Sequence, residues 1–185
     1  MKTASLAGLL QDQRGVAALE MALIAPFLLL ILAGTVDLGG VLYTRFQLSS
    51  AVNTAANYAI VNASGASSTG GGALAANLAT LITNVNGNGW ANSAVTVNDG
   101  PTASATNGST ATGGTAASAD SCYCPTGAAP AITWGAAKTC GVACASGYAG
   151  KFVLVTASRS YAPFFSSYGI VQSGAVSVSS MVQVQ

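Results

Sequence analysis

Only 6% of the 185 residues are charged, whereas about a quarter are charged in ordinary soluble domains. The net charge of +1 gives neither the basic surface that nucleic-acid binding requires nor a polybasic patch for anionic lipids. The chain contains no histidine, which excludes Ser–His–Asp and Cys–His catalysis. We therefore expect a protein that is not an enzyme, needs no cofactor and does not bind nucleic acid.

Residues 1–15 are interpreted as a short basic leader that ends at Gly15, before an apolar run from Val16 to Val36. This run is interrupted only by Glu20 and Pro26, and at ~1.5 Å per residue it is long enough to cross a ~30 Å hydrocarbon core. In a secretory signal peptide the small-residue cleavage site follows the apolar run, but here the glycine precedes it. The sequence therefore predicts that the membrane helix stays with the mature protein.

Glu20 is a carboxylate inside this membrane-spanning run, where an acidic residue costs about 2.5 kcal/mol or more at the helix centre. If the chain is cut between Gly15 and Val16, the new α-amine lies four residues before Glu20, and residues four apart share one face of a helix. The amine and the carboxylate can then neutralise each other, within one chain or between neighbouring chains.

The flanking charges predict the orientation of the helix. Lys2 and Arg14 precede the apolar run, and Arg45 follows it. The excess of basic residues on the N-terminal side favours a cytoplasmic N-terminus. We expect a single-pass protein of the inner membrane whose C-terminal domain is periplasmic.

The predicted fold class is α+β, a long N-terminal helix followed by a small antiparallel sheet. Residues 16–61 are expected to form one helix, bent near Pro26, whose second half is amphipathic. Residues 62–185 are expected to form the extracytoplasmic domain. Its predicted elements are a Ser/Gly linker at 64–72, a helix at 73–85, a turn at 86–89, strands at 95–97, 152–156 and 175–184, and a long surface loop at 99–120.

Four cysteines lie within the segment 121–144, at Cys122, Cys124, Cys140 and Cys144. An oxidising compartment favours disulfides over a four-thiolate zinc site, whose first pair is usually spaced by two to four residues rather than one. A bridge between Cys122 and Cys124 would close too small a loop. The pairing is then 122–144 with 124–140, or 122–140 with 124–144, and the sequence leaves both open.

Other candidate residues have simpler explanations. Asp99 and Asp120 are the only carboxylates of the domain that could form a general acid–base pair, and both lie in turn-like sequence. Asp37 follows the apolar run, where it is either a solvated residue or a packing or partner contact. The aromatic residues are expected to pack in a small core or against loops, and the pair 164–165 could instead be an exposed contact patch: Trp90, Trp134, Phe164, Phe165 and Tyr168.

Gly15, the spacing to Glu20 and the apolar helix resemble the cleavage site of type IV prepilins and pseudopilins. A further resemblance lies in the runs 22–30, 36–39 and 48–56, and near the C-terminus in 151–155 and Tyr161-Ala162-Pro163. These runs resemble the TadE-like family, which are pseudopilins of tight-adherence (Flp) pilus systems. The resemblance covers residues 14–61 and 150–185. Met21 and Gly40 depart from the family's pattern, which often has an aromatic residue and a basic residue there.

The resemblance implies a pseudopilin or minor pilin that is processed by a prepilin peptidase and takes part in pilus assembly. Its expected partners are the peptidase, other pilus subunits and an inner-membrane assembly platform. It also implies a packing or partner role for Asp37, because the family has an acidic residue there. Two alternatives remain at this stage, an uncleaved membrane-anchored adhesin or binding module and a secretion-system pseudopilin.

Overall fold

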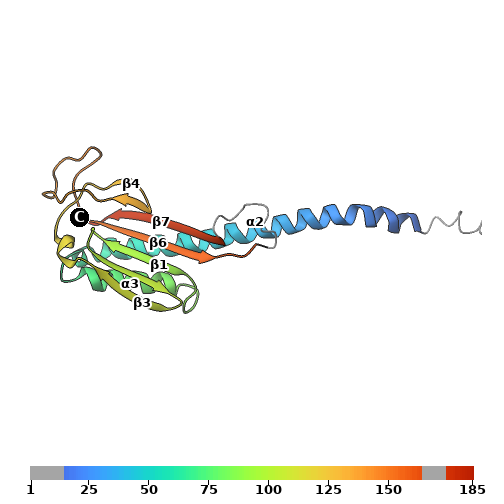
Figure 1. Ribbon diagram of the computed structural model, residues 1–185, viewed down its shortest axis with the longest axis horizontal. Helices are drawn as coiled ribbons and strands as arrows, with labels where there is room; N and C mark the ends of the chain where they lie inside the picture. Colours follow the sequence, from blue (N-terminus) through green and yellow to red (C-terminus); the bar gives the residue numbers. More distant parts are fainter. Residues whose placement is uncertain (1–14, 164–173) are drawn as a thin grey trace, which may run out of the picture.

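A computed structural model describes residues 15–163 and 174–185 (Figure 1). The first helix of the described part is the 46-residue α2, Val16–Val61, which has the bounds expected from the sequence. The N-terminal half of α2 projects as a rod, and its C-terminal half lies against a domain built from helix α3, Gly71–Thr83, and a five-stranded sheet. The predicted α+β class is confirmed.

A single stripe of small and aliphatic side chains attaches α2 to the domain. The stripe repeats at intervals of three and four residues, which places all its members on one face of the helix. Each member is at most 7% exposed, and together they are Leu48, Ala51, Val52, Ala55, Ala56 and Ala59. The opposite face carries the exposed polar residues Ser50, Asn53, Thr54 and Asn57, as the amphipathic pattern predicts.

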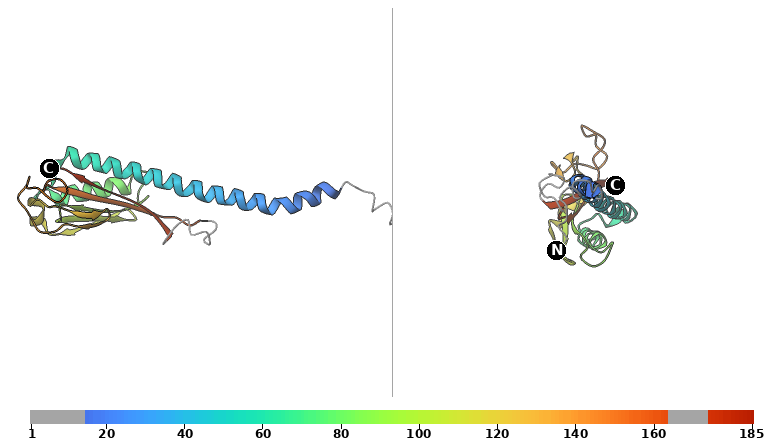
Figure 2. Two further views of the ribbon diagram at one scale, coloured as in Figure 1. Left: turned by 90° about the horizontal axis from the view of Figure 1, so that it is seen from above. Right: turned by 90° about the vertical axis from the view of Figure 1, so that its right-hand side faces the viewer.

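Helix α3 covers the same face of the sheet beside α2. Its buried residues again follow helical spacing: Leu74, Ala75, Leu78, Ala79 and Ile82. Figure 2 shows the two helices packed on one side of the strands. The core of the protein is therefore a layer between two helices and one sheet.

The sheet is antiparallel throughout, in the order β3-β2-β1-β6-β7. Its strands are β1 Asn92–Val97, β2 Pro101–Thr106, β3 Ser109–Gly114, β6 Phe152–Ser160 and β7 Ala175–Gln183. Strands β1 and β6 contain those expected at 95–97 and 152–156, and β7 covers all but the last residue of the one expected at 175–184.

Alternation along the strands decides which face of the sheet enters the core. Val95 of β1 lies opposite Ala103 of β2 and Val155 of β6, and all three side chains are buried. Because successive side chains point to opposite faces, the residues between them form the other face of the sheet, which neither helix covers. Small and hydroxyl side chains dominate that open face.

The predicted surface loop at 99–120 is wrong. Strands β2 and β3 form a hairpin over most of it, and a 3-10 helix, η3 Ala116–Asp120, follows. The Ala, Ser, Thr and Gly of this segment give little strand signal. Pairing of β2 with β1, and burial of Pro101, Ala103 and Ala105 on the core face, provide the stabilisation that local sequence does not.

The bend expected from Pro26 is visible in α2. Figure 2 shows the dark blue N-terminal part of the helix turning away from the axis of the remainder. The helix continues through Pro26 without interruption. The missing N–H and the ring of proline are the usual cause of such a bend, because they disturb the preceding turn.

Asn98 connects three parts of the domain from a fully buried position. Its side-chain amide donates hydrogen bonds to the carbonyl oxygens of Ala119 (3.0 Å) and Ser121, and its Oδ1 accepts one from the Phe152 N–H (3.3 Å). The β1–β2 turn, η3 and the start of β6 are thereby held together. Asn98 also has a left-handed backbone, with φ of 52°.

We predict that Asn98→Ala lowers the free energy of unfolding by about 2 kcal/mol or more beyond the effect of Asn107→Ala, because it leaves buried backbone groups without partners. Asn107 is the matched control, since its φ is 50° and its side chain is exposed. Both variants place an alanine in the left-handed backbone region, so the free-energy cost of that conformation is common to the two. Urea unfolding of the full chain in detergent, followed by tryptophan fluorescence, measures the difference. Equal losses in the two variants would contradict the role of Asn98.

Candidate functional site

The N-terminal half of α2 exposes apolar side chains on every side. Leu19, Leu23 and Phe27 are 65–69% exposed, and nothing of the sheet domain lies over them. Among the described residues α2 is the one helix long and apolar enough to cross a membrane. So much exposed apolar surface requires a covering, either lipid or the helices of other proteins.

The residues expected to be cut and to pair charges lie at the start of this rod. Gly15 immediately precedes the first residue of α2, Val16, and Glu20 follows one turn later on the same face. The Glu20 side chain is exposed, and it makes no hydrogen bond or ion pair with another residue in the described ranges. Among residues 15–163 and 174–185, no side chain neutralises the carboxylate.

Asp37 is fully buried, so its interpretation as a solvated residue is wrong. It lies where the exposed rod meets the sheet domain, and its backbone carbonyl accepts a hydrogen bond of 3.1 Å from the Tyr161 hydroxyl. The apolar run alone could not reveal this burial, because the covering residues come from the other end of the sequence. The alternative, a packing position, agrees with the observed burial.

Tyr161 lies directly over Gly40 on α2. A Cβ at position 40 would overlap the tyrosine hydroxyl and would be 3.1 Å from the ring carbon Cζ. The tyrosine follows β6 and, like Val41 of α2, is partly buried against the core. Gly40 is one of the two departures from the family's pattern, and the close approach of Tyr161 accounts for the absence of a side chain there.

Asp37, Gly40 and Tyr161 together form a junction between the membrane rod and the domain. Thr44, one turn further along α2, is also buried, and its hydroxyl donates to the Gly40 carbonyl (2.9 Å). On α2, Asp37 and Gly40 lie about three and two turns before the buried stripe begins at Leu48. The junction fixes the direction in which the rod leaves the domain, a feature that sequence reasoning missed.

Asp99 and Asp120 lie in a turn and at the end of η3, in keeping with their turn-like sequence. Asp99 lies in the turn between β1 and β2 with φ of 54°. The Asp120 carboxylate accepts a hydrogen bond of 2.8 Å from the Ser68 N–H and thereby ties η3 to the segment after α2. Hydrogen bonds from the Ser68 side chain and backbone hold the pKa of Asp120 below its usual value, so it is ionised at neutral pH.

The cysteines form two disulfides, one of the two pairings that the sequence leaves open. Cys122 pairs with Cys140 and Cys124 with Cys144, with Cα–Cα distances of 5.0 and 5.7 Å. In the part of the chain that the structure describes, no group of three or more potential metal ligands is present.

The aromatic residues have different neighbours. Trp90 packs at the edge of the core with the Arg159 guanidinium 4.8 Å from its ring centre. Trp134 stands edge-on to Tyr123 within the cysteine segment. Phe164, Phe165 and Tyr168 lie outside the described residues.

We predict that Gly40→Ala lowers the free energy of unfolding by about 1–3 kcal/mol, because the new methyl group displaces Tyr161. Gly39→Ala is the matched control: a Cβ there has no neighbour within 4 Å, and alanine is the better helix former, so stability should stay equal or rise by up to ~1 kcal/mol. Urea unfolding of the full chain in detergent measures both.

Tyr161→Phe removes the atom nearest to the added methyl group. In the Gly40→Ala background it should therefore cost less than it does alone, where it only removes the hydrogen bond to Asp37. Additive losses in this double-mutant cycle would argue against a direct contact between positions 40 and 161.

Comparison with known proteins gives one match. The family model described as TadE-like protein matches residues 15–57, which contain the apolar rod, the junction residues on α2 and most of the buried stripe. No curated protein and no solved structure matches the chain. The family match supports a role in a tight-adherence pilus system and a structural rather than enzymatic one. Residues 15–57 are therefore similar to the TadE-like family, in agreement with the resemblance seen in the sequence.

Proposed function

We propose that this protein is a pseudopilin or minor pilin that a prepilin peptidase cuts between Gly15 and Val16. In this proposal the mature helix waits in the inner membrane with its N-terminus at the cytoplasmic side. The sheet domain is periplasmic, and it primes, caps or joins a tight-adherence pilus. The proposal rests chiefly on one observation, a TadE-like helix whose first half is exposed all round while its second half is buried in a domain.

The division of α2 into two halves supports a protein that is first held in the membrane and later enters an assembly. In the membrane, lipid can cover Val16 to Val36. In a filament or an assembly complex, the helices of neighbouring subunits can cover the same surface. The buried stripe from Leu48 onward keeps the domain attached to the helix in both states.

The position of Gly15 supports cleavage there. It precedes the first residue of α2 and has no neighbour within 4 Å of where its side chain would be, so the adjoining peptide bond is accessible to a peptidase. Glycine also leaves little side chain in a close-fitting cleft. The same residue begins the segment matched by the TadE-like family model.

The exposed carboxylate of Glu20 supports charge pairing between subunits. Cleavage would create an α-amine on Val16, one helical turn away. In a low-dielectric environment the carboxylate needs a cationic partner, either this amine or the amine of a neighbouring subunit. In the second case Glu20 would set the register between a new subunit and the growing assembly.

We predict that Gly15→Val leaves uncut precursor in the membrane, because the branched side chain obstructs the peptidase cleft. Gly34→Val is the matched control, since it places the same side chain on α2 in open space and should be processed normally. Mass spectrometry of the N-terminal peptide from native membranes gives the answer. An intact Met1 in the wild-type protein of a strain with active pili would refute the pseudopilin proposal.

We also predict that Glu20→Ala and Glu20→Leu are cut and inserted but do not support pili. Removing one partner of a buried ion pair costs about 3–5 kcal/mol because the other charge is stranded, and here that cost falls on assembly. Glu20→Asp, with a shorter reach, should give an intermediate number of pili. Electron microscopy counts the pili on each strain.

Glu20→Gln separates charge pairing from a simple polar role. If the carboxylate only reaches the cytoplasmic interface, the amide should serve equally well and pili should be normal. If the charge itself is needed, Glu20→Gln should fail like Glu20→Ala. Normal pili in this strain would rule out the pairing.

A further inference from the structure

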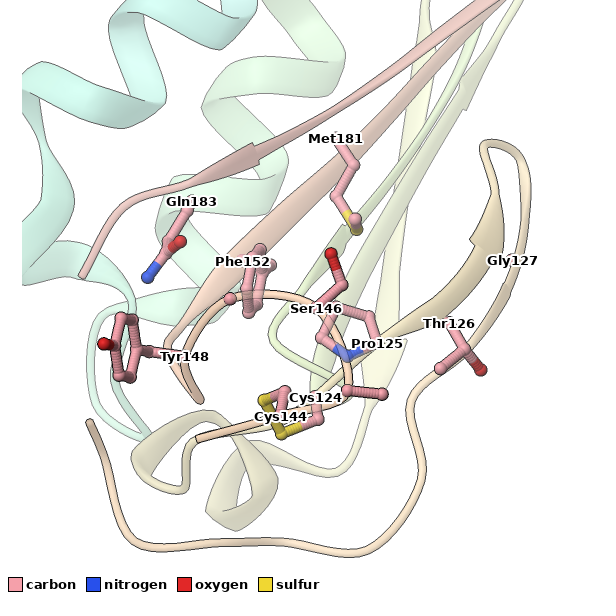
Figure 3. Close-up of a pocket in the computed structure, with 12 residues that line it drawn as sticks. Cys124, Pro125, Thr126, Gly127, Cys144, Ser146, Tyr148, Phe152, Met181 and Gln183 are labelled. Carbon is pink, nitrogen blue, oxygen red and sulfur yellow. A yellow bond between two sulfur atoms is a disulfide. The ribbon is translucent and has the colours of Figure 1, made fainter. Parts of the chain in front are cut away.

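A cleft of about 510 Å³ opens between the sheet and the cysteine segment (Figure 3). It lies at the end of the domain opposite the exposed rod of α2, near the C-terminus of the chain. Its floor is the open face of the sheet, where Phe152 of β6 and Met181 and Gln183 of β7 point into it. If the rod is in the membrane, the cleft faces away from it.

The wall of the cleft is built from cross-linked backbone. The Cys124–Cys144 disulfide lines it and ties the start of the two-stranded sheet β4 Thr126–Ala128 and β5 Ala131–Thr133 to the hairpin at 140–149. Hydrogen bonds from the Cys144 N–H to the Gly147 carbonyl (3.0 Å) and from the Ala149 N–H to the Val142 carbonyl (2.8 Å) close that hairpin. A pocket held in this way loses little conformational entropy when a ligand binds.

The lining chemistry is neutral and amphipathic. None of the 12 lining residues is charged. The Tyr148 ring stands at the rim of the cleft. Its exposed fraction, 67%, is high for an aromatic side chain of the domain. The Thr126 and Ser146 hydroxyls and the Gln183 amide supply hydrogen-bonding groups around the Phe152 and Met181 floor.

The neutral, amphipathic lining of the cleft favours some ligand classes over others. Ions and charged groups would find no counter-charge. An extended peptide could not add a strand at the Phe152 floor, because β6 already pairs with β1 on one side and with β7 on the other. The Gln183 side-chain N–H donates to the Gln185 carbonyl (3.1 Å), but a wholly apolar ligand would leave the Ser146 hydroxyl and the Gln183 Oε1 without partners. An uncharged sugar ring has both a C–H face for an aromatic ring and hydroxyls for the polar groups.

We propose that the cleft binds a neutral saccharide, with one face of a sugar ring on Tyr148 and its hydroxyls bonded to Ser146 and Gln183. The proposal concerns the domain and not the membrane helix. It is therefore independent of whether the protein acts as a pseudopilin. In a pilus-associated subunit, such a cleft would form a carbohydrate-binding site at the end of the domain.

Saturation-transfer NMR on the full chain, in a detergent without a sugar headgroup, tests the proposal. The probes are four uncharged tetrasaccharides, made of β-1,4-glucose, β-1,4-N-acetylglucosamine, α-1,4-glucose and α-mannose, with sialyllactose as the charged comparison. We expect transfer to at least one uncharged probe and none to sialyllactose. Transfer to none of the four, or to sialyllactose alone, would overturn the proposal.

Two tyrosine variants locate the site. Tyr148→Ala should weaken binding of the responsive probe by about tenfold or more, since it removes the stacking surface. Tyr58→Ala is the control, because Tyr58 is a partly exposed tyrosine on α2 that does not line the cleft. Unchanged affinity in Tyr148→Ala, or an equal loss in both variants, would overturn the assignment. The high exposure of Tyr148 makes a folding defect in its variant improbable, and circular dichroism checks for one.

Discussion

The close packing of a small-residue stripe on α2 against the sheet is the constraint on which the rest of the structure depends. Ala51, Ala55 and Ala59 are completely buried, so the helix backbone comes close to its neighbours along this stretch. Burial of one face over several turns holds the second half of a 46-residue helix in the domain. The first half is then free to serve as a membrane and assembly element without a second helix to anchor it.

The junction formed by Asp37, Gly40 and Tyr161 gives this division a fixed geometry. If the contacts began only at Leu48, the helix could bend between membrane and domain at its glycine positions. Tyr161 instead reaches about three turns further along α2 and donates a hydrogen bond to the Asp37 carbonyl. A subunit that must enter an assembly in one orientation benefits from such a rigid link, because the position of the domain is then determined by the position of the helix.

The domain folds with very few charged side chains. In place of the ion-pair networks of many small folds, the domain has two disulfides and two hydrogen-bonded side chains. Asn98 is buried and makes three side-chain hydrogen bonds, and Asp120 accepts one from the Ser68 N–H. The open sheet face and the cleft beside it are correspondingly neutral. Recognition at this end of the molecule therefore depends on shape, stacking and hydroxyl or amide hydrogen bonds rather than on long-range electrostatics.

The sequence by itself determined the helix from Val16 to Val61, its change from apolar to amphipathic character, the α+β class and the three strands with a strong apolar signal. These features follow from local periodicity, which a single chain displays directly. The position of Gly15 and Glu20 relative to the helix start is equally local.

Tertiary structure alone decided the features that join distant segments. Strand β2 forms because β1 offers a pairing edge and the core covers Ala103 and Ala105, and β3 then pairs with β2, although the residues of both strands favour a loop. The burial of Asp37 depends on contacts from a strand more than a hundred residues away, since Tyr161 reaches it with a sequence separation of 124. The cysteine pairing, likewise open in the sequence, is decided by which Cα atoms the folded loops bring within bridging distance.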